Sequence, residues 1–565
     1  MTEGAHNTPP AFRDVAVLLA LGAVLIVPAL FTRDAWTPDE PRYVEVAREM
    51  IARGDYLVLH LNGAAYSDKP PVFFWLTTVL WRLGCGMNSG RVVAAVAALA
   101  TVLLVYRLGR RLYGRETGYR AALICLTCML FLAIGKVGNL DAMLTFLVVA
   151  AISCGLQALE ARGRRAGAWW LGFYAAIALA VLVKGPVGLA TPALVVLTYG
   201  LAGRRQLAGG GWWHLGGVLL FAALVAAWLV PAALLGGREY AHDLIFQQTL
   251  QRVGKEAIHG EPIYAYVLQA PAYFFPWSLL LPLALVAAFR EAWGKGDPRA
   301  WLPVLWFVVI FVFFSLISGK RERYLLPIVP AVGLLVARYL GRAEREGPRW
   351  PDWHRGLWRA TFAVLLVLAA GILASSLFPG AVLGRAAKRS AAVRDFLASL
   401  PPLGMAIGAA AGLALGLLAL LGLRQRAAGA DRRRVWLLVG AVAVLSLCVD
   451  AAVLPVVNLR KSARLLAAEA RSVLGEADEV YLLRSNFGGV FNLALERAPL
   501  GELDSEDEVI AALNTDRRVA VVTRQSKMPD GVGSPRARIV RTPNARRQHM
   551  AFVVNWEQSP SPHRE

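Results

Sequence analysis

Long apolar runs separated by short polar connections fill most of the first 453 residues of this 565-residue chain. Of all residues, 57% are hydrophobic and only 18% are charged. Runs of about 17 to 25 apolar residues match the thickness of a bilayer, and a backbone in lipid must be helical because no water satisfies its polar groups. The pattern predicts an all-α polytopic membrane protein with about thirteen transmembrane helices, near residues 14–31, 90–107, 119–134, 140–158, 168–183, 186–202, 213–235, 267–288, 301–318, 324–340, 359–378, 404–423 and 434–453.

Arginine is concentrated in every second connection between these runs. The basic connections lie at residues 107–120, 162–165, 204–205, 290–299, 342–359 and 424–434. Two runs separate each from the next, so all lie on one side, and basic loops stay cytoplasmic. We therefore expect a cytoplasmic N-terminus and a periplasmic C-terminus. The same bias accounts for the net charge of +21, which is thus no sign of nucleic-acid binding.

Two N-terminal segments could be mistaken for something else. The first apolar run lacks a cleavage site of small residues, so we expect an anchor rather than a removed signal peptide. The run at 70–84 is short, begins with two prolines and contains Trp75 and Trp81, which favour the membrane interface. We predict a helix lying on the membrane surface there, because counting it as a span would make residues 32–69 cytoplasmic.

The predicted organisation is a transmembrane domain over residues 1–453 followed by a soluble periplasmic domain over 454–565. The transmembrane domain has two long outer loops, at 32–89 and 236–266. In the C-terminal region the pattern predicts a small α/β domain. Its expected strands are Glu479–Leu483, Val519–Val522 and Ala551–Asn555. Its expected helices are 460–475 and 506–514.

The first outer loop carries the densest polar motif, which begins Thr37-Pro-Asp-Glu-Pro-Arg-Tyr. Thr37 can cap a helix with Glu40 as its capping-box partner, and the alternating charges that follow predict an amphipathic surface helix. Asp39 would lie in the first turn, where the helix N-terminus favours an ionised carboxylate. Such a carboxylate serves as a base, a cation partner or a metal ligand, although capping alone also explains it.

Further charged residues lie at the outer ends of predicted spans. Lys69 precedes two prolines at the level of lipid headgroups, Asp141 begins a span, and Lys184 separates two spans. A snorkelling lysine and a capping acid are the plain alternatives. The segment Lys320–Arg323 places basic residues on the side that the positive-inside rule leaves poor in them, and a bound phosphate would explain this.

Six motifs in this order resemble the bacterial aminoarabinose transferases, which modify lipid A and are grouped with the protein O-mannosyltransferases in the GT-C class. They are Asp-Glu-x-Arg-Tyr at 39–43, Asp-Lys-Pro at 68–70, Leu-Asp at 140–141, Lys-Gly at 184–185, Gln-Arg at 251–252 with a following histidine, and Lys-x-x-x-Tyr-x-Leu-Pro at 320–327. The resemblance covers about residues 12–340 and implies a GT-C fold. Where the family has Lys-Leu-x-Thr-Tyr, this chain has Lys-Arg-Glu-Arg-Tyr, which indicates a different acceptor or sugar.

The resemblance also implies roles for single residues. The acidic positions of the family fall on Asp39 and Asp141, which we expect to be catalytic. A zinc ion in the family lies between an acid and a histidine, here Asp68 and His259. The expected contacts to the donor phosphate are Arg42, Lys69, Arg252, Lys320 and Tyr324, and the expected cavity-lining residues are Glu40, Tyr43, Tyr66 and Lys184.

The implied reaction is inverting transfer of a sugar from a polyprenyl-phosphate donor to a periplasmic acceptor at the bacterial inner membrane, and we expect transfer of the aminoarabinose type to lipid A. The phosphate leaving group needs charge neutralisation rather than a proton. If the acceptor is a hydroxyl, Asp39 acts as general base; if it is a lipid A phosphate, Asp39 binds the ammonium of the sugar. No nucleotide is expected, because the chain has no GxxxxGK[ST] loop.

Two other functions are compatible with the pattern. One is transfer of mannose or another hexose to a hydroxyl of a protein or glycan. The other is transport of a lipid-linked substrate, which usually places charged residues near the midplane rather than at span ends. Membrane lipids are expected partners in each case, and nucleic acid in none.

Overall fold

The computed structural model describes residues 12–203, 211–244, 261–294, 297–347, 352–382, 401–425, 431–483, 488–496, 500–524, 537–540 and 549–556, and 384, 399, 542 and 545 singly. By its internal contacts the chain forms two compact units. Unit 1 comprises Met1–Leu30, Asp68–Phe73 and Arg91–Val453. Unit 2 comprises Phe31–Ser67, Phe74–Gly90 and Leu454–Glu565.

Unit 1 is helical. Its elements are α1 (Phe12–Ile26), α5 (Ser89–Tyr113), α6 (Arg115–Leu126), α7 (Met129–Gly135), α8 (Leu140–Glu160), α9 (Gly163–Lys184), α10 (Val187–Ala202), α11 (Gly211–His242), α13 (Ala265–Tyr273), α14 (Leu281–Gly294), α15 (Pro298–Leu316), the short helix η5 (Glu322–Ile328), α16 (Val329–Glu346), α17 (Asp352–Leu377), α20 (Pro402–Leu423), α21 (Asp431–Cys448) and η7 (Val449–Val453). Three helices of the described residues cross the boundary between the units: α2 (Pro28–Thr32), α4 (Val72–Leu80) and α5.

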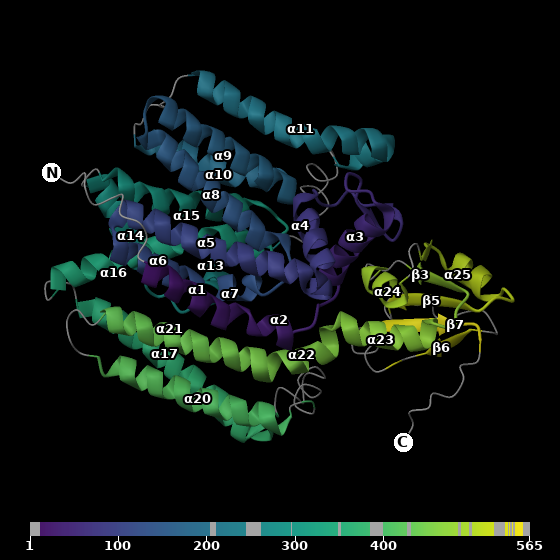
Figure 1. Ribbon diagram of the computed structural model, residues 1–565. Coiled ribbons are helices and arrows are strands. Elements are labelled where there is room, and N and C mark those ends of the chain that lie inside the picture. Colours follow the sequence, from purple (N-terminus) through teal and green to yellow (C-terminus); the bar gives the residue numbers. More distant parts are fainter. Residues whose placement is uncertain are drawn as a thin grey trace. The chain divides into compact units, whose positions relative to one another are not determined.

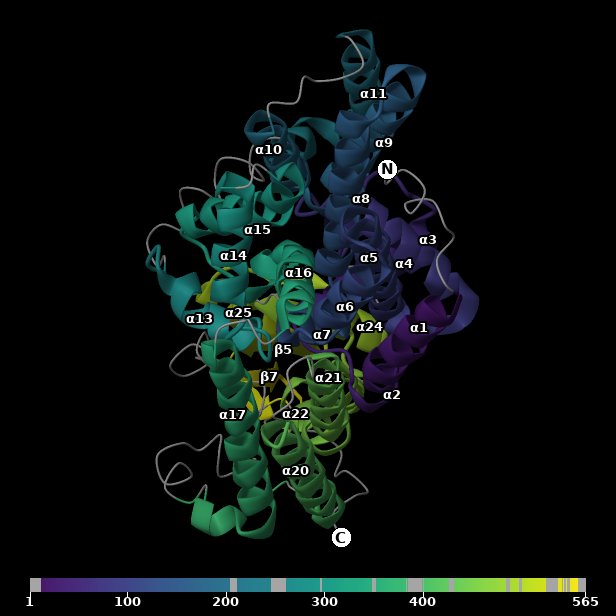
Figure 2. The same cartoon turned by 90° about the vertical axis from the view of Figure 1, so that its left-hand side faces the viewer.

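Neighbouring helices of unit 1 pack in layers. Figure 1 shows α8, α9, α10 and α11 side by side in blue, and α17, α20 and α21 side by side in green. In the view of Figure 2, α16 lies between α14 and α6, and 83% of its apolar window is buried. Only 11% of the corresponding window of α11 is buried, as in a helix that faces lipid. The chain is therefore a multi-span membrane protein with a helical core around α16.

The described residues contain ten helices long and apolar enough to cross a membrane, or eleven if the pair α6 and α7, bent by 63°, forms one span. The predicted count of thirteen is not confirmed. The run at 186–202 forms α10, an apolar helix of 16 residues that is shorter than the helices counted as long enough to cross a membrane. The run at 267–288 divides into α13 and α14, since prolines within it remove backbone donors and interrupt the helical hydrogen bonds.

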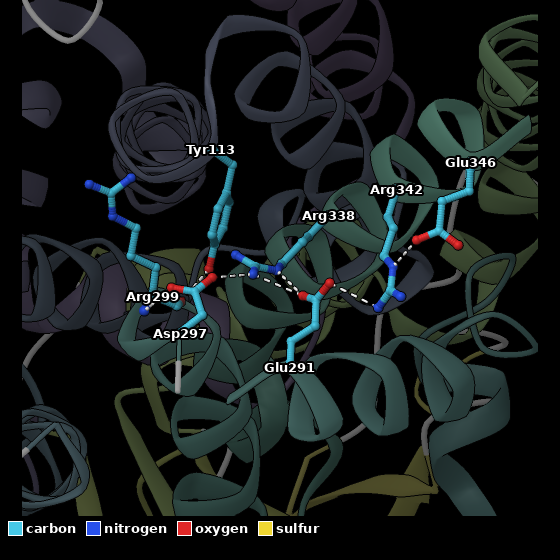
Figure 3. A network of polar contacts seen from close by, with 7 residues as sticks. All are labelled: Tyr113, Glu291, Asp297, Arg299, Arg338, Arg342 and Glu346. Carbon is cyan, nitrogen blue, oxygen red and sulfur yellow. Dashed lines mark hydrogen bonds and ion pairs between the residues drawn. The ribbon is translucent and has the colours of Figure 1, made fainter. Parts of the chain in front are cut away.

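One end of unit 1 is held by arginine ion pairs, and we call it the arginine-rich end (Figure 3). The guanidinium of Arg338, near the end of α16, binds the carboxylates of Glu291 at 2.8 Å and Asp297 at 2.6 Å. Arg342, one turn further on, binds Glu291 and Glu346. These contacts connect α14, α16 and the start of α15, as expected for a stabilising network rather than for a binding site.

Unit 2 combines helices with two sheets. Its elements are α3 (Asp39–Arg53), the hairpin strands β1 (His60–Leu61) and β2 (Ala64–Ala65), α4 (Val72–Leu80), the short helices η1 (Trp81–Cys85) and η2 (Gly86–Asn88), α22 (Leu454–Lys461), α23 (Ala463–Leu474), β3 (Glu479–Leu483), α24 (Gly488–Leu495), β4 (Gly501–Leu503), α25 (Glu506–Leu513), β5 (Val519–Arg524), β6 (Arg538–Val540) and β7 (Met550–Val554). The run at 70–84 is helical in α4 as predicted; that it lies on the membrane stays a prediction.

The C-terminal sheet has five strands in the order β4-β3-β5-β7-β6 (Figure 1). β3 is parallel to β4 and β5, and β7 is antiparallel to β5 and β6. Alternate residues of β5 point to opposite faces, so that Ala520 and Val522 pack with α23 and α24, while Val519 and Val521 pack with α25. The three predicted strands and two predicted helices of this region are confirmed.

Candidate functional site

Asp141 and three neighbouring residues form the clearest charged cluster of unit 1. Asp141 lies in the first turn of α8, where its backbone N–H donates to the capping side chain of Asn139 at 3.0 Å. Asp141 is only 4% exposed. The ammonium of Lys184, the last residue of α9, binds the Asp141 carboxylate directly. Arg323 Nε approaches the other oxygen of that carboxylate to 4.0 Å.

Tyr324 completes this group, which we call the Asp141 cluster. The ammonium of Lys184 lies 4.9 Å from the centre of the Tyr324 ring, within the range of a cation–π interaction. The ring stacks on Phe314 at a centroid distance of 5.3 Å, and this contact fixes its plane. The cluster thus gathers two cations, one carboxylate and one phenol from α8, α9 and η5. That set of groups suits recognition of an anionic group such as a phosphate.

A tight turn at the end of α9 positions Lys184 for its contact with Asp141. Gly185 follows Lys184 with a φ of 78°, a conformation that glycine adopts without strain, and α10 begins two residues later at Val187. The turn is tight, since the Gly188 N–H donates to the Gly185 carbonyl at 2.9 Å. Lys184 therefore projects from a short connection between two helices, as the sequence predicts.

Lys320 donates to two backbone carbonyls, and its expected contact to the donor phosphate stays a prediction. Its ammonium donates to the backbone carbonyls of Ile317 at 2.8 Å and Glu261 at 3.0 Å. It therefore holds the segment before η5, and Arg323 rather than Lys320 reaches Asp141. From the sequence, Arg323 was named only as part of the basic segment, and nothing in the sequence indicated that Arg323 rather than Lys320 would contact Asp141.

The remaining expected residues of unit 1 are Asp68 and Lys69. Lys69 is buried, and its ammonium donates to the Asp68 carbonyl at 2.7 Å. The described ranges contain no group of three or more His, Cys, Asp or Glu side chains that could hold a metal ion. Arg252 and His259 lie outside the described residues. The zinc site and the phosphate contact of Arg252 stay predictions.

The motif of the first outer loop lies in unit 2 and forms the start of α3. Asp39 is the first residue of this helix, and its carboxylate pairs with Arg42 one turn later at 2.5 Å. Pro38 occupies the capping position, and it makes no side-chain cap bond. The predicted capping box of Thr37 and Glu40 is wrong.

Glu40 instead binds the residues before the helix. Its buried carboxylate accepts from Arg33 at 2.9 Å and from the backbone N–H of Trp36 at 2.7 Å. The guanidinium of Arg33 also lies 3.9 Å from the centre of the Trp36 ring. Glu40 therefore fixes the turn that leads into α3, which accounts for its burial without a ligand; its place in a cavity stays a prediction.

The two tyrosines expected in the cavity share one packing partner. The rings of Tyr43 and Tyr66 both meet Phe74 edge to face, at 5.8 Å and 6.1 Å. Arg42 lies 5.5 Å from the Tyr43 ring. Within unit 2 the structure thus joins Tyr43 to Tyr66 through Phe74, and Asp39 to Tyr43 through Arg42.

Glu45 is a buried acid that sequence reasoning placed on an exposed face. Its side chain is fully buried, and both oxygens accept from Arg48 at 2.7 Å. Burial raises the pKa of Glu45 to about 7, although Arg48 acts in the opposite direction. Glu49 is buried too, and accepts from the backbone N–H groups of Asn62 and Gly63. The predicted amphipathic helix exists, but its charged face is covered within unit 2.

The cover comes from α24. A Cβ atom on Gly489 would lie 2.8 Å from the Cα of Arg42 and 3.3 Å from the Cβ of Glu45, so only glycine permits this approach. Because α24 is more than 400 residues away in the chain, no local pattern around Glu45 reveals the contact.

The chain is similar in sequence to known glycosyltransferases. Residues 68–230 match the family model of dolichyl-phosphate-mannose-protein mannosyltransferase. The chain is 32% identical over 335 residues to undecaprenyl phosphate-alpha-4-amino-4-deoxy-L-arabinose arabinosyl transferase 2 of Proteus mirabilis (strain HI4320), covering 57% of this chain and 59% of the relative. It is 33% identical over 378 residues to transferase 1 of the same description from Sodalis glossinidius (strain morsitans), covering 64% and 65%. The chain spans about three fifths of the length of these relatives.

Among solved structures, the chain is similar to ArnT from Cupriavidus metallidurans bound to undecaprenyl phosphate, with a TM-score of 0.73 and 21% identity over 98% of this chain and 100% of that one. The apo state of the same protein gives a TM-score of 0.75 and 21% identity over 96% and 98%. These likenesses show the fold. Together with the sequence relatives, they confirm the resemblance that the six motifs indicate.

Proposed function

This chain is a relative of the bacterial aminoarabinose transferases with their GT-C fold, and from that premise we propose that it is an inverting glycosyltransferase using a polyprenyl-phosphate sugar donor. Its multi-span membrane character and its ArnT-like fold imply the inner membrane. The observation that carries the proposal is the Asp141 cluster, in which Lys184 and Arg323 approach one carboxylate and the Tyr324 ring lies beside the Lys184 ammonium.

The chemistry needs a place where negative charge is stabilised. The acceptor oxygen attacks the anomeric carbon, and the bond from that carbon to the phosphate oxygen breaks. The polyprenyl phosphate leaves with the bonding electrons and gains one negative charge without needing a proton. A well-placed donor to such developing charge is worth roughly 3 kcal/mol in the transition state. We assign this role to Lys184, Arg323 and Tyr324.

For the other expected residues we keep the roles that the resemblance implies. Asp39 acts as general base toward a hydroxyl, or binds the ammonium of an aminosugar. Arg42, Lys69, Arg252 and Lys320 contact the donor phosphate, and the acceptor is lipid A. The relatives are named for transfer of 4-amino-4-deoxy-L-arabinose, which favours the ammonium role of Asp39.

We place the Asp141 cluster in the periplasm. α8 runs from Leu140 to Glu160, and a helix of its 21 residues is about 30 Å long. Asp141 lies in its first turn, and Glu160 at its other end pairs with Arg111 at 3.0 Å. Because the arginine-rich connections belong on the cytoplasmic side, the other end of α8 faces the periplasm. Single cysteines near residue 139 and near residue 161, tested with a membrane-impermeant thiol reagent in cells, would show labelling only at the first.

The proposed function is tested by two substitutions in one helix. Asp141→Asn removes the acid of the cluster, and Glu160→Gln removes an ion-paired acid at the other end of α8. Purified protein is mixed in vesicles with undecaprenyl-phosphate aminoarabinose and lipid A, and the product is measured by mass spectrometry. We expect D141N to lose transfer at least a hundredfold and E160Q to retain it. Equal transfer by both variants would reject the assigned site.

A second candidate is transfer of a hexose to a hydroxyl of a protein or glycan. It is favoured by the match of residues 68–230 to a mannosyltransferase model and by Arg323, which stands in the motif where the aminoarabinose transferases have threonine. Replacing the donor in the same assay by undecaprenyl-phosphate mannose, and lipid A by a hydroxyl acceptor, distinguishes the two.

A further inference from the structure

A second charged cavity lies at the arginine-rich end of unit 1, separate from the Asp141 cluster. Its volume is about 580 Å³, and it is formed by residues of α1, α6 and α21. Three arginines line it, Arg13, Arg115 and Arg432, one from each of these helices. Its size lies within the range of sites that bind small molecules or headgroups. Nothing in the transfer reaction uses it.

The acids in the cavity are already engaged with cations. The two oxygens of Asp14 accept from the guanidinium of Arg115 at 2.7 and 2.8 Å, and the hydroxyl of Tyr106 also donates to one of them. Glu116 accepts from Arg120 at 3.0 Å, and Arg120 in turn binds Glu344.

Arg432 and Arg13 are held less tightly. The Arg432 side chain is 73% exposed, and the nearest Glu116 oxygen lies 4.0 Å from its Nε. Arg13 is exposed, and within the described ranges no ion pair of its guanidinium is found. Three arginines and two carboxylates leave the lining with one positive charge, which complements the single negative charge of a phosphodiester.

The backbone adds to this positive field. α1, α6 and α21 all have their N-terminal ends at the cavity, since they begin at Phe12, Arg115 and Asp431. Helix N-termini carry partial positive charge and unsatisfied N–H groups, and both favour phosphate. α6 follows Gly114, which has no side chain to cap the helix.

Two aromatic rings form part of the lining. Tyr119 and Trp436 line the cavity with ring centres 6.3 Å apart, and aromatic residues of these types gather at membrane interfaces. Phe12, at the same end of α1, is 88% exposed. Arginines at helix ends suit a lipid phosphate, and aromatic rings beside them suit the glycerol and the first carbons of the acyl chains.

We propose that this cavity is a binding site for an anionic phospholipid of the leaflet on the arginine-rich side, with the lipid phosphodiester between Arg13 and Arg432. Basic pockets between transmembrane helices on the cytoplasmic side are the kind of site that retains such headgroups. The bound lipid contacts the N-terminal ends of α1, α6 and α21, and adds to the direct contacts that Asp14 and Tyr119 make between these helices.

The test uses the full chain in detergent with equal amounts of phosphatidylglycerol and phosphatidylcholine, and counts retained lipids by native mass spectrometry. Wild-type protein is expected to retain one phosphatidylglycerol preferentially. The pair R13Q/R432Q is expected to retain it less by on the order of tenfold. R433Q/R355Q, which removes two exposed arginines that do not line the cavity, is the matched control and is expected to match wild type within about twofold.

Two further arms keep the proposal falsifiable. R13K/R432K preserves both charges and is expected to restore most of the retention, which a folding defect of the glutamine pair would not explain. Inorganic phosphate at millimolar concentration is expected not to displace the lipid. Equal loss in the control pair, no preference for phosphatidylglycerol, or full displacement by free phosphate would each overturn the lipid site.

Discussion

The buried ion pair between Lys136 and Asp450 makes the most demanding test of the packing of unit 1. Lys136 follows α7, five residues before Asp141, and Asp450 lies in η7. The Lys136 ammonium binds the two Asp450 oxygens at 2.8 and 2.7 Å and the Ser446 hydroxyl at 2.7 Å, so all three of its N–H donors are used. The two side chains are only 9% and 2% exposed.

Removing one partner leaves an uncompensated buried charge. K136M should therefore lower the free energy of unfolding by about 3–5 kcal/mol, and D450L by a similar amount. The double variant K136M/D450L leaves no buried charge, and we expect it to recover to within about 2 kcal/mol of wild type. Because Lys136 immediately precedes the turn to α8, the single variants should also displace Asp141 and slow sugar transfer.

The assay is reversible unfolding of the full chain in mixed micelles, with tryptophan fluorescence as the readout and E160Q as control. The Arg111–Glu160 pair is 38% and 23% exposed, and such pairs contribute about 0–1 kcal/mol. The reasoning is refuted if each single variant costs less than about 1 kcal/mol. It is equally refuted if the double variant loses the sum of both.

Three further outcomes are expected. The pKa of Glu45 is raised from 4.5 to about 7 in the folded chain, so the folded state holds the Glu45 proton more tightly than the unfolded state. This stabilisation is complete below pH 4.5 and is lost as the pH rises to 7, so E45Q should remove a pH dependence of about 3 kcal/mol from the free energy of unfolding. A wild-type free energy of unfolding that stays constant from pH 5 to 8 would contradict this prediction. G489A should cost about 1–3 kcal/mol, because its Cβ meets the Arg42 backbone; a neutral result in thermal unfolding would show that α24 does not pack closely on α3. R338Q should lower the free energy of unfolding by about 2 kcal/mol, while R345Q at the same helix end should leave it unchanged. Equal free energies of unfolding for the two variants would show that the ion pairs of Figure 3 do not stabilise the fold.

The sequence pattern predicts those parts of the fold that depend on local periodicity. The strands at Glu479 and Val519 were predictable because buried apolar residues there occupy both faces of a short run between polar segments. The break between α13 and α14 was missed because mean hydropathy does not register the loss of helical hydrogen bonds at prolines. The same average hides the bend between α6 and α7.

The site was predictable only where a residue type marks a helix end. Asp141 and Lys184 stand out as charges at the ends of apolar runs, and the structure joins them in one ion pair. Arg323 and Glu45 could not be chosen, because their importance comes from elements remote in sequence. Arg323 meets the start of α8, and Glu45 is covered by α24.

The central claim is that the cations of the Asp141 cluster hold the phosphate of the lipid-linked donor. The most direct measurement is the equilibrium affinity of the purified chain for undecaprenyl phosphate, compared among wild type, K184Q, R323Q and R111Q. We predict that K184Q and R323Q each weaken binding by about tenfold or more, since each removes a charge-assisted contact worth roughly 1.5–3 kcal/mol, and that R111Q at the other end of unit 1 leaves it unchanged. Equal affinities in all four proteins would contradict the account.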